Sequence, residues 1–343
     1  MHLYGTAVLG RSPQKWYEDQ FLLNNIELTH HPEPLHKFIR VGLENHIDEL
    51  VQYANDENFD WLFFGWEMFP AFQKLWEHKQ RSFKILIYAQ EQPQRLGDIP
   101  NLRKYCDKLY TSAPTFQDNT DGYIPFPVHT AYASSHLGML EKRKQILISG
   151  SFRQCRYELF ERLLREQPFE WPIKFLPSGI KWEPIGRTQY EELITRFPNS
   201  IVQVPQQQSD YIPALLSAIS SSTLFIDCTF NPYPELKMSQ AHSSLNDVLS
   251  IKNYKGGYMP ERVLDACNWG SFPVCLKNPA IKYCLGDKVS YYDSYENLLD
   301  LVNRWIGKEV QEQLNDLLTI ASLMEDYSTE TIIKRLSSIF KEV

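Results

Sequence analysis

The sequence lacks the features that mark membrane-spanning or disulfide-rich proteins. No apolar run approaches the roughly 18 residues of a membrane-spanning helix, and residues 1–10 have neither the basic nor the long apolar segment of a signal peptide. The six cysteines form no Cys-x-x-Cys pair and stand at no zinc-ligand spacing. We therefore expect free thiols, a cytoplasmic location and no metal site, and we leave a peripheral membrane contact open.

Several catalytic motifs are also missing. The chain has no Gly-x-x-x-x-Gly-Lys-Ser/Thr loop, no Gly-x-Gly-x-x-Gly after its first strand and no Gly-x-Ser-x-Gly. These absences argue against a P-loop ATPase, a NAD enzyme and an α/β-hydrolase. Positive charge is scarce, since 42 Asp and Glu outnumber 35 Lys and Arg and give a net charge of −7. A protein that coats nucleic acid needs the opposite balance, so nucleic acid is a disfavoured partner.

The composition is that of a folded protein with two domains. At roughly 150 residues per domain, 343 residues suggest two domains, and 43% hydrophobic residues against 22% charged residues exclude disorder. In the first part of the chain, short apolar segments alternate with helical periodicity. Strands are predicted at 3–9, 61–64, 84–88 and 108–111, with a helix at 35–55 between the first two.

A Pro-rich segment at 123–128 and a polar stretch at 130–144 precede a second alternation. Strands are predicted at 145–151, 173–176, 201–204, 223–228, 272–276 and 289–292, and helices at 156–166, 211–220, 259–268 and 296–306. The tail 309–341 is predicted to be helical in two pieces, the second with Ser328 as its N-cap. Strands separated by helices predict parallel sheets, and hence an α/β fold of two Rossmann-like domains facing a cleft.

The segment 255–274 contains the richest set of chemical groups. Pro260 fits the first turn of a helix, and free N–H groups at a helix start favour an anion. Arg262 adds a forked cation suited to phosphate oxygens, and Asp265 lies on the same helix face, where a carboxylate can accept hydrogen bonds from sugar hydroxyls. From spacing alone, a helix start with a surface Arg–Asp pair explains these residues equally well.

This segment resembles the donor-binding motif of GT-B glycosyltransferases, and more narrowly the spore-maturation-type, group 1 branch. The shared core, Pro-x-Arg-x-x-[Glu/Asp]-Ala-x-x-x-Gly, is met by Pro260, Arg262, Asp265, Ala266 and Gly270. The resemblance implies that Asp265 holds the ribose of a nucleotide-diphosphate sugar and Arg262 its phosphates, with Gly257 and Tyr258 in the same donor-binding stretch. Many retaining members have a glutamate where this chain has Gly257, so inversion and retention both stay open.

The resemblance also implies a domain organisation. An N-terminal acceptor domain would cover 1–138 and a C-terminal donor domain 139–315, and a C-terminal helix at 316–343 would return to the N-terminal domain. The absence of any Asp-x-Asp pair disfavours the metal-dependent GT-A arrangement, so we expect catalysis without a metal ion or cofactor.

A second group of phosphate-binding candidates follows the strand 145–151. Gly150 and Ser151 permit close approach of the backbone to a ligand, and Arg153 is placed to reach the same diphosphate. Arg156, which begins the next helix, is expected to be a surface charge. In the first domain Glu67 and Glu91 follow strands, and His129 lies at the domain junction. These three are candidates for the base that activates an acceptor hydroxyl.

The sequence therefore predicts a glycosyltransferase that moves a sugar from a nucleotide-diphosphate sugar to a hydroxyl of a glycan, a lipid-linked sugar or a surface polysaccharide. Two alternatives stay open. One is a phage-type transferase that glycosylates DNA bases, and the other is a non-catalytic protein that binds nucleotide sugars.

Overall fold

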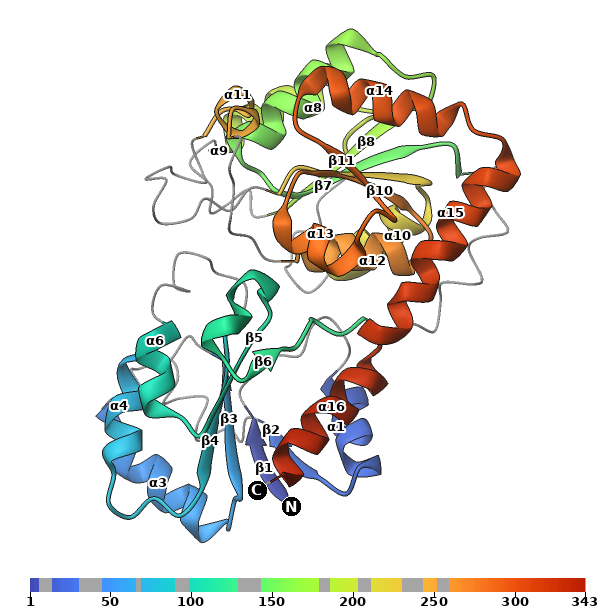
Figure 1. Ribbon diagram of the computed structural model, residues 1–343. Helices are drawn as coiled ribbons and strands as arrows, with labels where there is room; N and C mark the ends of the chain where they lie inside the picture. Colours follow the sequence, from blue (N-terminus) through green and yellow to red (C-terminus); the bar gives the residue numbers. More distant parts are fainter. Residues whose placement is uncertain are drawn as a thin grey trace. The chain divides into compact units, whose positions relative to one another are not determined.

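The computed structural model divides the chain into two compact units (Figure 1). The N-terminal unit comprises Met1–Pro127 with Asp326–Val343, and the C-terminal unit comprises Val128–Glu325. Within them the structure describes residues 1–5, 14–30, 45–65, 69–89, 99–128, 143–178, 186–202, 211–229, 243–251 and 259–342. None of the helices in these ranges has the length and apolar character needed to cross a membrane.

The N-terminal unit is built on a parallel sheet in the order β2-β1-β3-β4-β5-β6. Its strands are β1 (His2–Gly5), β2 (Glu27–His30), β3 (Trp61–Gly65), β4 (Lys84–Ala89), β5 (Lys108–Thr111) and β6 (Gly122–Tyr123). The strands predicted at 61–64, 84–88 and 108–111 are confirmed within one residue. The edge strand β2 was not predicted, because the half-buried sequence Glu-Leu-Thr-His has no apolar run.

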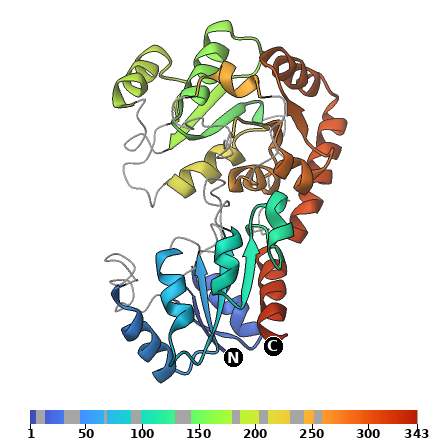
Figure 2. The ribbon, with the colours of Figure 1, turned by 60° about the vertical axis from the view of Figure 1, so that its left-hand side comes forward.

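Helices cover both faces of this sheet (Figures 1 and 2). They are α1 (Gln14–Leu23), α3 (Ile47–Asp56), α4 (Phe69–Glu77), α6 (Ile99–Leu102) and α16 (Thr329–Lys341). The expected helix at 35–55 is not continuous, because His46 is the N-cap of α3 and has non-helical backbone angles. Residues 35–44 lie outside the residues that the structure describes. From the end of the chain, α16 packs on α1, and its Phe340 lies edge-on against Trp61 and Phe63 of β3. Ser328 caps α16 as predicted, accepting a hydrogen bond from the Thr331 N–H.

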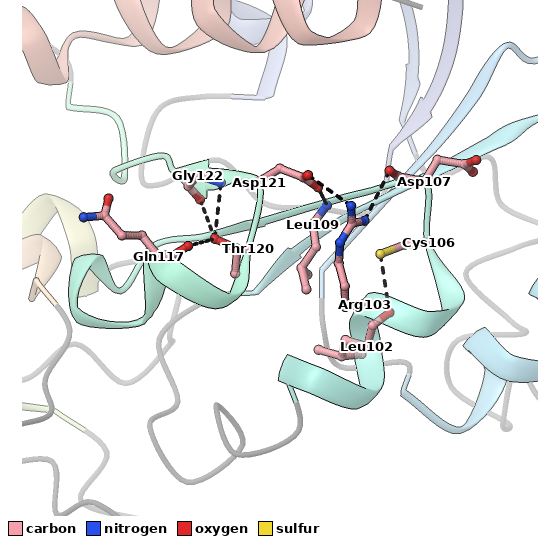
Figure 3. A network of polar contacts seen from close by, with 9 residues as sticks. All are labelled: Leu102, Arg103, Cys106, Asp107, Leu109, Gln117, Thr120, Asp121 and Gly122. Atoms are coloured by element: carbon pink, nitrogen blue, oxygen red, sulfur yellow. Dashed lines mark hydrogen bonds and ion pairs between the residues drawn. The ribbon is translucent and has the colours of Figure 1, made fainter.

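Three aspartates fix the amino ends of neighbouring strands in this sheet. Asp60, Asp107 and Asp121 directly precede β3, β5 and β6. The backbone N–H of each aspartate donates to the carbonyl of a residue in the adjacent strand of the sheet. The aspartate carboxylate accepts a hydrogen bond from the N–H of that same residue. The partners are His2 (carboxylate to N–H 2.8 Å), Ile85 (2.8 Å) and Leu109 (2.7 Å). Arg103 joins the last two aspartates by donating to the Asp107 carbonyl and the Asp121 carboxylate (Figure 3). At the starts of β3, β5 and β6, a carboxylate thus adds one hydrogen bond to the backbone hydrogen bonds between neighbouring strands, which helps to fix the strand register.

The C-terminal unit has a parallel sheet in the order β11-β10-β9-β7-β8. The strands are β7 (Ile146–Ser151), β8 (Ile173–Ser178), β9 (Leu224–Asp227), β10 (Phe272–Leu276) and β11 (Ser290–Tyr292). Ile201 continues the sheet beyond β8 through an isolated bridge to Phe175. From β7 the chain proceeds to β8 on one side, and from β9 to β10 on the other. The switch in direction between β7 and β9 is the place where open α/β sheets bind ligands.

The helices of this unit lie on both sides of the sheet (Figure 1). One side of the sheet carries α8 (Gln154–Glu166) and α14 (Tyr295–Ile306). The other side carries α10 (Tyr211–Ser220), α12 (Glu261–Asn268) and α13 (Pro279–Leu285) (Figure 1). The remaining helices are α9 (Gly186–Arg196), α11 (Leu245–Leu249), which packs on α8, and α15 (Val310–Leu323). The predicted helix 211–220 and strand 272–276 are confirmed in full. The α/β fold with two parallel sheets is therefore confirmed.

A buried arginine joins two helices at the amino edge of this sheet. Arg143 is only 5% exposed and donates to the carbonyls of Ile219 (2.9 Å), Ser222 and Gly270 (3.3 Å). These carbonyls lie at the ends of α10 and α12, where the helix dipoles place partial negative charge. Burial lowers the pKa of Arg143 to about 10, because the guanidinium has lost most of its hydration. The three carbonyls compensate part of this loss.

Candidate functional site

The candidate site lies at the carboxyl ends of β7 and β9, at the switch point of the C-terminal sheet. Because these strands are parallel neighbours, the segments that follow them meet at one edge. One segment leads through Gly150 and Ser151 into α8, and the other runs from Asp227 to Thr229. The start of α12 belongs to the same edge, since α12 connects β9 to β10.

Arg156 is the most unusual group at this edge. Its side chain was expected at the surface, but it is 3% exposed, so that expectation is wrong. In its guanidinium group, Nη1 donates a hydrogen bond to the Ser151 carbonyl (2.8 Å), whereas the buried Nε has no hydrogen-bond partner. Gly150, at a φ of +139°, passes directly over the guanidinium, and a Cβ there would lie 2.9 Å from Arg156 Cζ. The glycine is therefore required to make room for this arginine.

The charge on Arg156 is poorly compensated. No ion pair joins it to a carboxylate among the residues that the structure describes. Burial lowers the pKa of Arg156, and the positive charges of Arg262 and Arg153 lower it further, while Cys155 and Asp227 offset only part of this decrease. A buried cation without a carboxylate partner is energetically costly, so an anion at this edge would relieve the cost.

Arg262, in contrast, already has an anionic partner. Its Nε donates to Asp227 Oδ1 (3.0 Å), and its Nη2 donates to Thr229 Oγ1. Asp227 is 0% exposed and also accepts the Thr229 hydroxyl (2.6 Å). Arg262 therefore forms an ion pair with Asp227. The sequence analysis missed Asp227, although its position at the end of a predicted strand was a usable signal.

Two helices begin at this edge without side-chain caps. The N-cap of α8 is the half-buried Arg153, and the N-cap of α12 is Pro260, and neither side chain makes a capping hydrogen bond. In contrast, Asn278 caps α13 and Ser294 caps α14, which start at the same edge. Pro260 was expected inside the first turn, but the helix begins one residue later, at Glu261. Uncapped helix starts leave N–H groups for an anionic ligand.

The other predicted residues divide into two groups. Asp265 lies one turn after Arg262 in α12 and is 7% exposed. Gly257 and Tyr258 of the donor stretch, and the base candidates Glu67, Glu91 and His129, lie outside the residues that the structure describes. In the sequence, Glu67 follows β3 and Glu91 follows β4. Their roles stay predictions.

A pair of thiols lies beside Arg156. Cys155, in the first turn of α8, and Cys228, after β9, are both buried and hydrogen-bond to each other. This hydrogen bond, with the charges of Arg156 and Arg153, lowers the pKa of Cys155, while the same hydrogen bond and burial raise the pKa of Cys228. A helix start and nearby arginines are the usual causes of a thiolate. All six cysteines are free thiols, five of them buried.

We expect the stability of the protein to rise with pH between about pH 7 and 8.5 because of Cys155. Its pKa is lower in the folded state, so the unfolded chain binds more protons in this window, and the slope reaches at most about 1.4 kcal/mol per pH unit. Urea denaturation of wild type and Cys155→Ser at several pH values measures the difference. Cys284→Ser, which changes a half-exposed thiol, should retain the wild-type slope. Equal slopes for wild type and Cys155→Ser would refute the assignment.

A separate groove of about 1210 Å³ lies in the N-terminal unit along α3 and α4. Acidic and basic side chains line it together, including Asp48, Glu77, Lys74 and His78. Its lining includes Asp56 and Glu77, the last residues of the helices that precede β3 and β4. In the described ranges, no group of three or more His, Cys, Asp or Glu side chains is arranged to hold a metal ion.

Two units with parallel sheets, helices on both faces and a switch point define the GT-B fold, the architecture of a large class of glycosyltransferases. No protein-family model and no curated protein sequence matches the chain. Solved structures do match it. Sucrose-phosphate synthase from Thermosynechococcus elongatus is similar over 99% of this chain and 98% of its own, with a TM-score of 0.67 and 9% identity.

Two further structures are similar over their whole length. The Anabaena protein Alr3699/HepE, in complex with UDP and glucose, covers 100% of this chain and 99% of its own, with a TM-score of 0.61 and 11% identity. A glycosyltransferase from Rickettsia africae covers 99% of this chain and 97% of its own, with a TM-score of 0.61 and 10% identity. At these identities the similarity establishes the fold, and the predicted GT-B fold is confirmed. The narrower spore-maturation-type branch stays a prediction.

Proposed function

We propose that the protein is a glycosyltransferase that binds a nucleotide-diphosphate sugar at the switch point of its C-terminal unit and transfers the sugar to a hydroxyl group. The observation that carries the proposal is Arg156, a buried cation beside the Gly150 backbone with no carboxylate partner among the described residues and no acceptor for its Nε. A diphosphate supplies the negative charge and the acceptor oxygens that this guanidinium lacks. The structures of Alr3699/HepE with UDP and with UDP-glucose, which have the same fold, support this choice of ligand.

Each donor-site residue has a distinct role in this proposal. Arg156, Arg153 and the uncapped starts of α8 and α12 bind the diphosphate. Arg262, fixed by Asp227, approaches the same group. As the bond to the sugar breaks, negative charge develops on the leaving diphosphate, and these cations and N–H groups stabilise it without a metal ion. Asp265 accepts hydrogen bonds from the ribose hydroxyls.

The acceptor is assigned to the N-terminal unit. Glu67, Glu91 or His129 would accept the proton of the acceptor hydroxyl. A glycan, a lipid-linked sugar or a surface polysaccharide presents such a hydroxyl. A cytoplasmic location rests on the free cysteines, which suit a reducing compartment.

A nucleotide panel tests the donor site. We expect one or more of UDP, GDP, ADP and dTDP to raise the melting temperature of the wild type, because a ligand that binds only the folded state stabilises it, by about 2.7 kcal/mol at 100 times Kd. The protein should also slowly hydrolyse sugars carried by the nucleotides that bind. CMP-sugars, which lack the diphosphate, are the control and should not be hydrolysed. Absence of any shift at millimolar concentration contradicts the proposal. A shift without hydrolysis or transfer would favour the non-catalytic binding protein.

A further inference from the structure

Asp227 and Thr229 form a buried pair at the end of β9 that touches Arg262. We propose that they are positioning residues of the donor site, which hold the Arg262 guanidinium in the orientation that the diphosphate requires. The inference rests on the proposed function, because it takes the diphosphate as the ligand of Arg262. It assigns a role to two residues that no motif in the sequence identified.

The contacts hold one whole edge of the guanidinium. Arg262 Nε donates to Asp227 Oδ1 at 3.0 Å, and Nη2 donates to Thr229 Oγ1. Nε and Nη2 lie on the same side of the planar group, so the two contacts fix both its position and its plane. A single acceptor would leave the plane free to rotate.

The pair is itself held rigidly. Thr229 donates twice to the Asp227 carboxylate, through its hydroxyl (2.6 Å to Oδ1) and its backbone N–H (3.0 Å to Oδ2). On the other side, the hydroxyl of Tyr292 donates to the Asp227 carbonyl (3.1 Å). Both residues of the pair are fully or almost fully buried. Arg262 therefore rests on a support that is part of the sheet.

A positioning role explains this arrangement better than a stabilising one. A buried ion pair adds little net stability, because desolvation offsets its attraction. An arginine that is ordered in advance loses less rotamer freedom when its ligand binds, which improves affinity. The pair also neutralises Arg262 before the ligand arrives, which reduces the repulsion between Arg262 and the nearby buried Arg156.

A double-mutant cycle tests the inference by the affinity for the nucleoside diphosphate that binds the wild type most tightly among UDP, GDP, ADP and dTDP. The variants are Thr229→Val, Arg262→Lys and the double variant, measured by calorimetry. Lysine retains the charge but has no planar edge for Thr229 to hold. We expect Thr229→Val to weaken binding about tenfold in the wild type and less than about twofold in the Arg262→Lys background.

Two further variants separate positioning from stability. Thr229→Ser retains the hydroxyl and should restore affinity to within about twofold of the wild type. Thr223→Val removes another buried threonine hydroxyl of the same unit, which donates to the Arg143 carbonyl at the opposite edge. It should lower the melting temperature and leave the affinity unchanged.

The possible results are distinguishable. If Thr229→Val retains wild-type affinity, or loses the same factor in both backgrounds, Thr229 does not act through Arg262 and the inference is overturned while the donor site stands. If the wild type binds none of the four nucleotides, the proposed function fails and the inference fails with it.

Discussion

Replacement of Arg156 by methionine is expected to have opposite effects on stability and on ligand binding. Without ligand, the variant should be more stable than the wild type by about 1–2 kcal/mol, because a buried cation without a carboxylate partner is replaced by an apolar side chain of similar length. The lost hydrogen bond to the Ser151 carbonyl offsets part of this gain, by about 1 kcal/mol.

The same substitution should weaken nucleoside diphosphate binding by a factor of 100 or more, since removing a buried charge-assisted contact costs about 2–5 kcal/mol. Denaturant unfolding and calorimetry measure the two effects. Arg165→Met, at an exposed position of the same helix, is the matched control and should change neither quantity appreciably. A destabilised variant that still binds nucleotide would mean that Arg156 is a structural residue, contrary to the proposal.

Replacement of Arg143 by alanine should have the largest effect on stability. We expect the C-terminal unit to lose about 3 kcal/mol or more, because the Gly270 carbonyl loses its donor, two helix ends lose a compensating charge and a cavity remains. Arg143→Lys retains the charge but not the fork, and should lose about half as much.

Hydrogen exchange resolved by peptide identifies where the loss occurs. Peptides from β7 and β9 should exchange faster, while those from β3 and β4 in the other unit keep their protection. Arg304→Ala, in the exposed part of α14, is the control and should have little effect. Uniform loss of protection in both units, or none, would refute the view that Arg143 anchors α10 and α12. Arg143 and Arg156 should therefore respond in opposite directions, since in the described part of the chain Arg143 donates to three carbonyls and Arg156 to one.

The sequence predicted the sheets well where strands are apolar and central. The segments 84–88, 108–111 and 272–276 are fully buried or nearly so in the structure, and burial on both faces produces the continuous apolar runs that mark them. The edge strand β2 has no such run, because one side of it is exposed. The helix expected at 35–55 does not continue through His46, because periodicity does not specify where one helix ends and another begins.

The site was harder to predict for a different reason. Arg262 and Gly150 were identified because local sequence marks a helix start and a strand end. Arg156 was judged to be a surface charge, since nothing in its own helix indicates that the Gly150 backbone covers it. Asp227 was missed because its partner Arg262 lies 35 positions away. Burial and long-range pairing are tertiary properties, and these are what distinguish a buried cation without a carboxylate partner from one that is already in an ion pair.

The aspartates at the amino ends of β3, β5 and β6 have a consequence for how this protein can change. Asp60, Asp107 and Asp121 determine the alignment of neighbouring strands at one edge of the N-terminal sheet. The segments 66–68 and 90–98, which contain Glu67 and Glu91, follow β3 and β4 at the other edge. The three aspartates make these contacts without using any residue of those segments. Under the proposed function, in which Glu67 or Glu91 serves the acceptor, an evolving or engineered chain could exchange these segments while the three aspartates keep the strands in register.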